Sequence, residues 1–187
     1  MHIIDILLLV VKSEGEDGLC GRTLLQKKVY FLSVLMKFDL GFSPHYYGPY
    51  SSYVASHLDS LVNCGLLKEV TESFSDEQNV FGEIRRHTYS VPDNIEPVWQ
   101  DIQEKPQFDE WQDALKRINE QNISRDFNKL SIAAKVHYIV SWEGNGPLTL
   151  PQVQQIAEEY KWDVKPEDIE SVLSFLKGLG LVTTDES

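Results

Sequence analysis

The chain has 187 residues, of which 42% are hydrophobic and 25% charged, the composition of an ordinary globular protein. This apolar content excludes wholesale disorder, because there is enough hydrophobic surface to offset the entropy of the chain. Its 17 basic and 29 acidic side chains give a formal charge of −12, which argues against unaided binding to nucleic acid or an anionic membrane as the main role. The length suggests one domain or two small ones.

The N-terminal residues 3–12 predict a buried helix rather than a signal peptide, since they are apolar nearly all round. Asp5 interrupts the run, no basic region precedes it, and the stretch 6–11 is too short to span a bilayer. We therefore expect a cytoplasmic protein. Cys20 and Cys64 lack metal-ligand spacing and are expected to be reduced thiols, buried or half-buried.

Residues 1–92 predict a winged-helix-like unit of three helices followed by a β-hairpin. Thr23 and Gln26 have the spacing of a capping box at the start of the second helix, and Ser51 or Ser52 can cap the third. Hydrophobic periodicity and turn residues set the remaining boundaries. In order along the sequence, the expected elements are helices over about 3–12, 24–37 and 52–63 and strands over about 66–74 and 84–91.

Two further regions follow this unit. Residues 93–128 predict a helical linker, in which a helix over about 107–119 starts after Pro106. Residues 129–187 predict a second helix-turn-helix-like unit with its own capping box at Thr149 and Gln152, so that the two units look like a repeat. The fold class expected from the sequence is therefore mainly α with a small β-hairpin (α+β).

The charge is unevenly distributed between the two halves. Residues 1–92 contain 8 basic and 11 acidic side chains (net −3), whereas residues 93–187 contain 9 and 18 (net −9). In a winged helix the basic residues of the first unit could contact a nucleic-acid backbone. The candidates for such contacts are Arg22, Lys27, Lys28, Arg85, Arg86 and His87. The expected third helix has no Lys or Arg and carries Asp59, so solvated surface charges are the favoured interpretation.

Two separated segments are the least generic part of the sequence: Leu-Gln-Lys-Lys-Val-Tyr-Phe at 25–31 and Tyr-Gly-Pro-Tyr-Ser at 47–51. The loop between the second and third helices is rich in aromatic side chains, which supply large and rigid contact areas with polar tips. The candidate partner-binding residues are Gln26, Lys27, Tyr30, His45, Tyr46, Tyr47, Gly48, Pro49 and Tyr50. We expect Gln26, Tyr30 and the loop to share one polar site. The alternative is that Tyr47 and Tyr50 only pack the loop onto the neighbouring helices.

These segments resemble the Panacea antitoxin-like family, which includes SocA-like and YwgA-like proteins. Its members show an LQKLVYF helix, an aromatic loop ending in YGPYS or YGPV, and a helix that ends in a Gly-Leu turn. The resemblance covers residues 23–67, about a quarter of the sequence, with Lys28 where the family has Leu. It implies a small cytoplasmic antitoxin, proteolytic adaptor or defence-associated module. The implied partner is a toxin, a protease or a defence component, and no catalytic activity is implied.

The chemistry-bearing residues do not form a known catalytic pattern. The five histidines have no metal-type spacing, and neither a phosphate-binding loop nor a nucleophile elbow is found. We therefore expect no enzyme activity, no cofactor and no metal. The leading hypothesis is a non-enzymatic protein-interaction module, antitoxin- or phage-defence-associated, that docks a partner through the aromatic loop and the second helix. The alternative is a winged-helix DNA-binding transcriptional regulator that uses Arg22, Lys28, Arg85 and Arg86 on phosphates.

Overall fold

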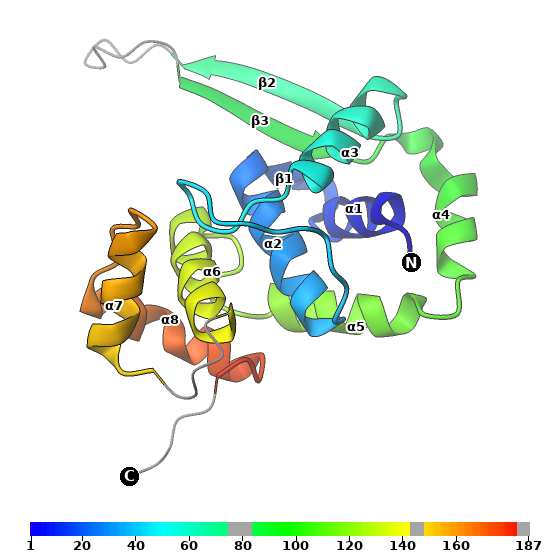
Figure 1. Cartoon of the computed structure of the whole chain (residues 1–187). Coiled ribbons are helices and arrows are strands. Elements are labelled where there is room, and N and C mark those ends of the chain that lie inside the picture. The colour runs from blue at the N-terminus through cyan, green and yellow to red at the C-terminus, as the bar shows by residue number, and fades with distance from the viewer. Residues whose placement is uncertain (75–83, 143–147, 183–187) are drawn as a thin grey trace.

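A computed structural model describes residues 1–74, 84–142 and 148–182 and gives a mainly helical α+β fold with a small antiparallel sheet (Figure 1). In order along the sequence, the elements are α1 (Ile3–Lys12), the 3-10 turn η1 (Gly15–Asp17), β1 (Leu19–Cys20), α2 (Arg22–Leu35), α3 (Ser52–Asn63), β2 (Lys68–Phe74), β3 (Ile84–Ser90), the 3-10 turn η2 (Asp93–Ile95), α4 (Glu96–Gln103), α5 (Phe108–Asn119), α6 (Phe127–Trp142), α7 (Leu150–Glu159) and α8 (Pro166–Gly178). The expected fold class is confirmed. None of the helices in the described residues has the length and apolar character that crossing a bilayer requires.

The sheet has the strand order β1-β3-β2, with both pairs antiparallel. β2 and β3 pair from Lys68 opposite Ser90 to Phe74 opposite Ile84, and form the hairpin at the top of Figure 1. β1 was not expected, because two residues after a glycine turn are too few to show an alternating pattern. The element order from α1 to β3 fits the expected winged-helix-like unit, while the predicted turn at 75–83 lies outside the described residues.

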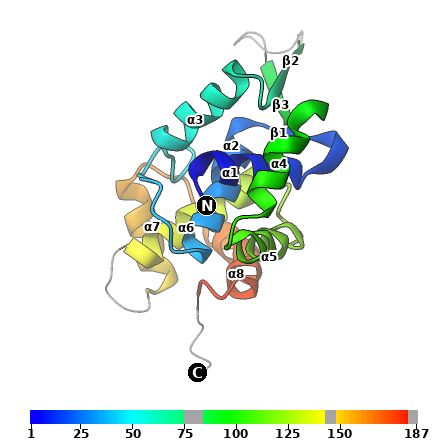
Figure 2. The ribbon, with the colours of Figure 1, turned by 90° about the vertical axis from the view of Figure 1, so that its right-hand side faces the viewer.

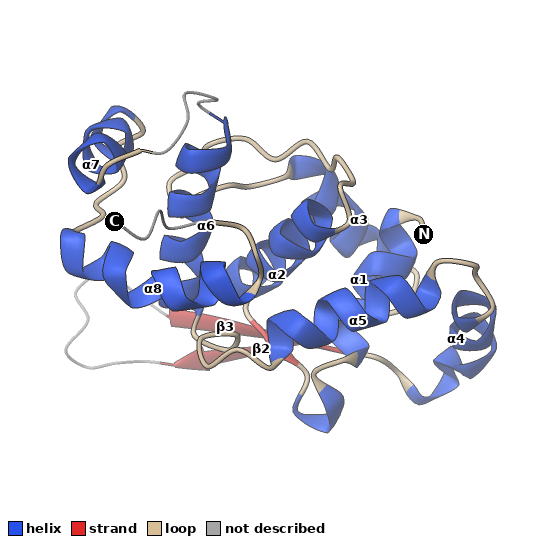
Figure 3. Ribbon diagram, turned by 90° about the horizontal axis from the view of Figure 1, so that it is seen from below, coloured by secondary structure: helices blue, strands red, loops and turns tan. Residues whose placement is uncertain are grey.

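Helix α2 is the central helix of the molecule. It contacts α1 and α5 and also α6, so that it lies between the N-terminal and C-terminal elements (Figure 3). As a result, ten consecutive residues from Leu24 to Ser33 are buried. The buried hydrophobic side chains form one continuous cluster, which runs from Ile3 to Leu179. The regions predicted as first unit, linker and second unit therefore share a single core.

One of the two expected capping boxes is wrong. α2 begins at Arg22 after Gly21, which has no side chain to cap the helix, and Thr23 lies within the first turn. The Gln26 side chain is instead used in a tertiary contact with Ser51. At α7 the expected pairing is confirmed, since Gln152 Oε1 accepts a hydrogen bond from the backbone N–H of Thr149 at 2.8 Å. The predicted repeat therefore does not extend to its capping residues.

The expectation of buried cysteines is also wrong. Cys20 and Cys64 are both exposed free thiols. Cys20 alternates with buried Leu19 in β1, so its side chain points away from the core. Cys64 follows the last turn of α3, where the helix leaves the core.

In the side view, strands β2 and β3 and helix α3 lie at one end of the molecule, and α8 lies at the other (Figure 2). α1 and α2 lie between them, as expected for the two helices that contribute most of the buried side chains of the first unit. The loop between α2 and α3 carries the distinctive Tyr-Gly-Pro-Tyr-Ser segment at 47–51. This loop therefore starts from the centre of the fold.

Candidate functional site

The two distinctive sequence segments bind each other. The Gln26 side chain bonds to the backbone of Ser51 in both directions: its Nε2 donates to the carbonyl oxygen at 3.0 Å, and its Oε1 accepts from the N–H at 3.1 Å. The Lys27 ammonium donates to the carbonyl oxygen of Pro49 at 2.7 Å. All of these atoms are buried, which makes each bond costly to lose. The conformation of the aromatic loop is thus fixed by the start of α2.

The loop is held on its other side by the C-terminal elements. Trp162, between α7 and α8, donates its indole N–H to the carbonyl oxygen of His45 at 2.6 Å. Gly48 adopts φ +91° and lies against α6, where an added Cβ would be 3.0 Å from Lys135 Cγ and 3.4 Å from the Ser131 carbonyl oxygen. Only glycine combines this backbone angle with so close an approach. The loop is therefore fixed by three separate parts of the protein.

Replacing Gly48 by alanine is expected to lower the free energy of unfolding by about 2 kcal/mol, from left-handed backbone strain and the contact with Lys135. Gly41→Ala is a matched control, because Gly41 has φ +66° but no atom of the described residues within 4 Å of its added Cβ. It is expected to cost about 1 kcal/mol from backbone strain alone. Urea denaturation of both variants measures the difference, and equal losses would show that α6 does not restrict the loop at Gly48.

The loop and α3 carry a group of exposed and half-buried aromatic rings, which we call the aromatic patch and define as His45, Tyr46, Tyr47, Tyr50, Tyr53 and His57. The tyrosines at 46, 47 and 53 are 71%, 56% and 45% exposed. The rings form three separate pairs, with centroid distances of 4.8 Å for Tyr46–Tyr47, 5.0 Å for His45–Tyr50 and 4.2 Å for Tyr53–His57. Tyr53 and His57 were not among the residues expected from the sequence, although both lie on α3, which begins after the segment 47–51.

A small pocket of about 110 Å³ lies between the start of α2, the loop and α3. It brings together six of the candidates expected from the sequence: Arg22, Gln26, Lys27, His45, Tyr47 and Tyr50. Burial lowers the pKa of Lys27 to about 7, and the nearby positive charge of Lys135 acts in the same direction. The pocket therefore contains an amine whose charge changes near neutral pH.

The shared polar site expected for Gln26, Tyr30 and the loop is wrong. Tyr30 is buried, and its hydroxyl lies 2.8 Å from His137 Nδ1 on α6, whereas Gln26 bonds to Ser51. The two side chains leave α2 towards different neighbours. His137 is thus a buried core histidine with a polar partner, and burial lowers the pKa of its imidazole to about 4.

Lys27 and Lys28 were candidates for contacts with a nucleic-acid backbone, but neither side chain is accessible for such a contact. Lys27 and Lys28 are each 1% exposed. Lys28 Nζ contacts the Glu14 carboxylate and donates to Asn119 Oδ1 at 2.8 Å, and Arg125 Nε lies 3.5 Å from the same carboxylate group. The reason is the central position of α2, whose polar side chains are covered by neighbouring elements.

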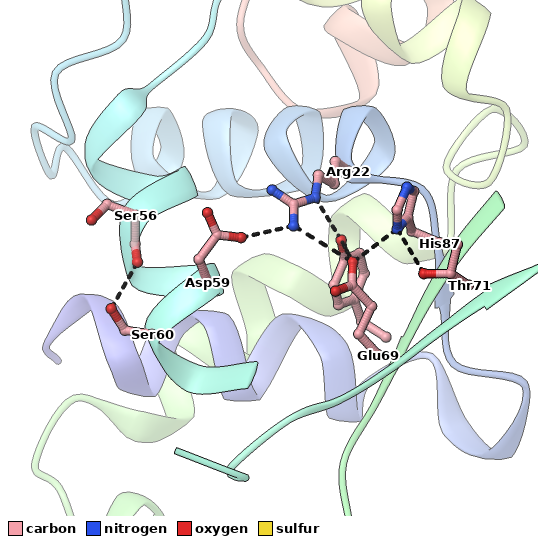
Figure 4. Close-up of polar contacts among 8 residues, drawn as sticks. Arg22, Ser56, Asp59, Ser60, Glu69, Thr71 and His87 are labelled. Atoms are coloured by element: carbon pink, nitrogen blue, oxygen red, sulfur yellow. Dashed lines mark hydrogen bonds and ion pairs between the residues drawn. The ribbon is translucent and has the colours of Figure 1, made fainter. Parts of the chain in front are cut away.

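Arg22 is exposed but belongs to a polar network on the first unit (Figure 4). Its Nη2 lies 2.7 Å from Asp59 Oδ1 of α3, and its Nε donates to the Tyr89 hydroxyl at 2.8 Å. Glu69 Oε1 accepts from that hydroxyl at 2.6 Å and lies 2.9 Å from His87 Nδ1. Burial raises the pKa of Glu69, but the bond from Tyr89, the charge of Arg22 and the contact with His87 lower it overall. The positive charge of Arg22 is thus opposed by two carboxylates.

The other basic candidates lie on β3. Arg86 is exposed, and His87 is half-buried against Glu69. The backbone of Arg85 pairs with Ser73, but its side chain lies outside the described part of the protein. The β3 candidates therefore lie on the hairpin and not on α3, the helix expected to read DNA in a winged helix.

Comparison with known proteins assigns no family: no protein-family model matches the sequence, and no curated protein matches it. Across the described residues, no group of three or more His, Cys, Asp or Glu side chains is arranged to hold a metal ion. The indication of a function therefore comes from the geometry of the loop between α2 and α3. It combines an exposed aromatic surface with a small pocket, both built from the two motifs.

Proposed function

We propose that this protein is a non-enzymatic interaction module that docks a partner protein through the aromatic patch. The observation that carries the proposal is that Tyr46 and Tyr47 are 71% and 56% exposed on a loop whose backbone is held by α2, α6 and Trp162. Large rings on a fixed backbone lose little conformational entropy when a partner covers them. Tyrosine is also enriched among the residues that dominate binding energy.

The proposed partner is a toxin, a protease or a phage-defence component, and the proposed location is the cytoplasm. Support comes from the resemblance of segments 25–31 and 47–51 to the Panacea antitoxin-like family. In this proposal the two motifs have separate tasks. Gln26 and Lys27 fix the loop from inside, and the tyrosines contact the partner from outside.

The alternative of a DNA-binding winged helix has less support. Lys27 and Lys28 are buried, and Arg22 is paired with Asp59 on the helix that would enter the groove. A mobility-shift assay over a range of salt concentrations discriminates between the two functions. A phosphate-binding surface gives steeply salt-dependent affinity, whereas the proposed interaction module is expected to show no affinity for DNA.

Photo-crosslinking tests the proposed function directly. A benzophenone amino acid replaces Tyr46 in the full-length protein in the native host, and Phe38 in a control. Phe38 is 39% exposed, but its ring packs against Trp111 of α5, outside the aromatic patch. We expect one specific protein adduct from position 46 and not from position 38, identified by mass spectrometry.

The partner identified in this way is then measured against purified variants. Tyr46→Ala/Tyr47→Ala is expected to weaken binding about 30-fold, which corresponds to about 2 kcal/mol, while circular dichroism stays unchanged. Phe38→Ala is expected to change the affinity less than about 3-fold, since it leaves the patch intact. Equal affinity of the double variant and the unaltered protein would contradict docking through the patch.

A further inference from the structure

Lys27 is a buried amine that has no carboxylate partner among the described residues. Its side chain is 1% exposed, and its one hydrogen bond goes to the neutral carbonyl of Pro49. Within residues 1–74, 84–142 and 148–182, no carboxylate lies within ion-pair distance of its ammonium, whereas the adjacent Lys28 is paired with Glu14. The charge that acts on Lys27 is that of another lysine, Lys135. Burial disfavours the charged form of this amine, and an anion bound from outside the molecule would favour it.

The pocket beside Lys27 combines apolar side chains of α3, Ala55 and Leu58, with polar groups of α2 and the loop. Arg22 also lines it, although its charge is shared with Asp59 and Glu69, and Thr23 is in the first turn of α2. That helix end has no acidic residue in its first turn, and Gly21 provides no capping side chain, so no side chain of the helix start itself offsets the positive end of the helix dipole. Tyr47 and Tyr50 of the loop also line the pocket, and a tyrosine hydroxyl group can donate a hydrogen bond.

We propose that this pocket binds a carboxylate group, presented by the same partner that covers the aromatic patch. The source of the carboxylate rests on the proposed function, whereas the anion site rests on the pocket itself. A volume of about 110 Å³ suits the end of an aspartate or glutamate side chain, or the terminal carboxylate of a peptide, and is small for a nucleotide. Tyr47 belongs to both the pocket and the patch, so a partner seated on the rings would reach the pocket with one acidic residue.

The charges around the pocket predict how the binding depends on pH. The groups that face Lys27 are Arg22 of its own helix, Lys135 of α6, and His45, Tyr47 and Tyr50 of the loop. Asp163 and Asp168 act on Lys135 rather than on Lys27. Because a carboxylate prefers the protonated amine, the affinity should fall as the pH rises through about 7, the pKa of Lys27.

Acetate is the probe for the pocket, used with the full-length protein and observed by ¹H–¹⁵N NMR against chloride at equal ionic strength. At pH 6 we expect saturable shifts of the Thr23 and Gln26 amides with acetate and none with chloride. The affinity is expected to drop at least about 5-fold in Lys27→Met, and about 5-fold in the unaltered protein between pH 6 and 8.5. In Lys27→Met this pH dependence should be smaller than in the unaltered protein.

Two further variants make the result decisive. Lys129→Met removes an exposed positive charge on α6 away from the pocket and should leave acetate binding unchanged. Arg22→Gln changes a second basic residue that lines the pocket, and it should lower the affinity for acetate about 3-fold. This variant tests the anion site even if Lys27→Met does not fold. Absence of saturable shifts, or equal acetate affinity with and without Lys27, would overturn the anion site.

The partner found by crosslinking decides where the carboxylate comes from. If Lys27→Met weakens both acetate and the partner at least about 5-fold, the pocket receives an acidic group of that partner. If acetate binding needs Lys27 but the partner affinity does not, a partner carboxylate is excluded and the pocket takes a free small acid. If acetate binds in the pocket and no protein is crosslinked at position 46, the proposed function fails while the anion site stands.

Discussion

Replacing Lys28 by methionine is expected to lower the free energy of unfolding by about 3 to 5 kcal/mol. The side chains of Lys28 and Glu14 are 1% and 5% exposed, and they contact each other across the junction of α2 and the turn after α1. Burial lowers the pKa of Lys28, and the contact with Glu14 partly offsets this by favouring the charged form. Methionine matches the shape of the lysine stem but leaves the Glu14 carboxylate buried. The exposed Arg125, at 3.5 Å, is then its remaining ion-pair partner.

A double-mutant cycle isolates the ion pair from the loss of side-chain packing. Glu14→Gln combined with Lys28→Met should recover more than half of the loss, because no uncompensated charge remains. Lys116→Met is the matched surface control: its partner Glu120 is 3.9 Å away, and the two side chains are 70% and 62% exposed. This control should change stability by less than about 0.5 kcal/mol in urea denaturation. Similar losses for Lys28→Met and Lys116→Met would show that burial of the pair is not what stabilises it.

Acidification between pH 6.5 and 4 is expected to destabilise the protein by roughly 3 kcal/mol through His137 alone. Burial lowers the pKa of this histidine from 6.5 to about 4, and its ring nitrogen lies 2.8 Å from the Tyr30 hydroxyl. Between these two values the unfolded chain takes up a proton that the folded protein does not, so unfolding becomes more favourable as the pH falls. The contribution is fully present above pH 6.5 and does not decrease further below about 4.

His137→Gln separates this effect from the titration of the carboxylates. Glutamine keeps a polar partner for Tyr30 but does not titrate in this range. Urea denaturation at pH 7 and at pH 4.5 should show a smaller acid loss in the variant than in the unaltered protein, by about 2 to 3 kcal/mol. Parallel pH profiles for the two proteins would contradict the assignment to His137.

Several elements of the fold could be predicted because a local pattern specifies them. Residues 3–12 form α1 as expected from their apolar run, and Ser51 caps α3 by accepting from the Val54 N–H at 3.1 Å. The spacing of buried Trp111 and Leu115 also predicted α5 correctly. β1 could not be predicted, since it exists only through its pairing with Tyr89 and Thr88 of β3.

Local patterns did not reveal how the candidate residues are arranged. Six of the residues that the sequence singled out line one pocket, and their role as a site stays a prediction. The sequence-based prediction treated the polar residues of α2 as surface groups, because a lysine in an amphipathic helix is usually solvated. Its mistake at Thr23 has the same origin, since local spacing does not show that Gln26 would find a partner in the distant loop.

The amino-acid sequence by itself determined the helical class, the aromatic content of the loop and the concentration of acidic residues after residue 92, because composition and local periodicity carry this information. The tertiary structure decided which motif residues face inward and which face solvent. Helix α2 is covered by α5 and α6, which buries Lys27 and Lys28 and leaves Tyr46 and Tyr47 exposed. That outcome depends on contacts between segments more than a hundred residues apart, such as Trp162 with His45, which no local pattern encodes.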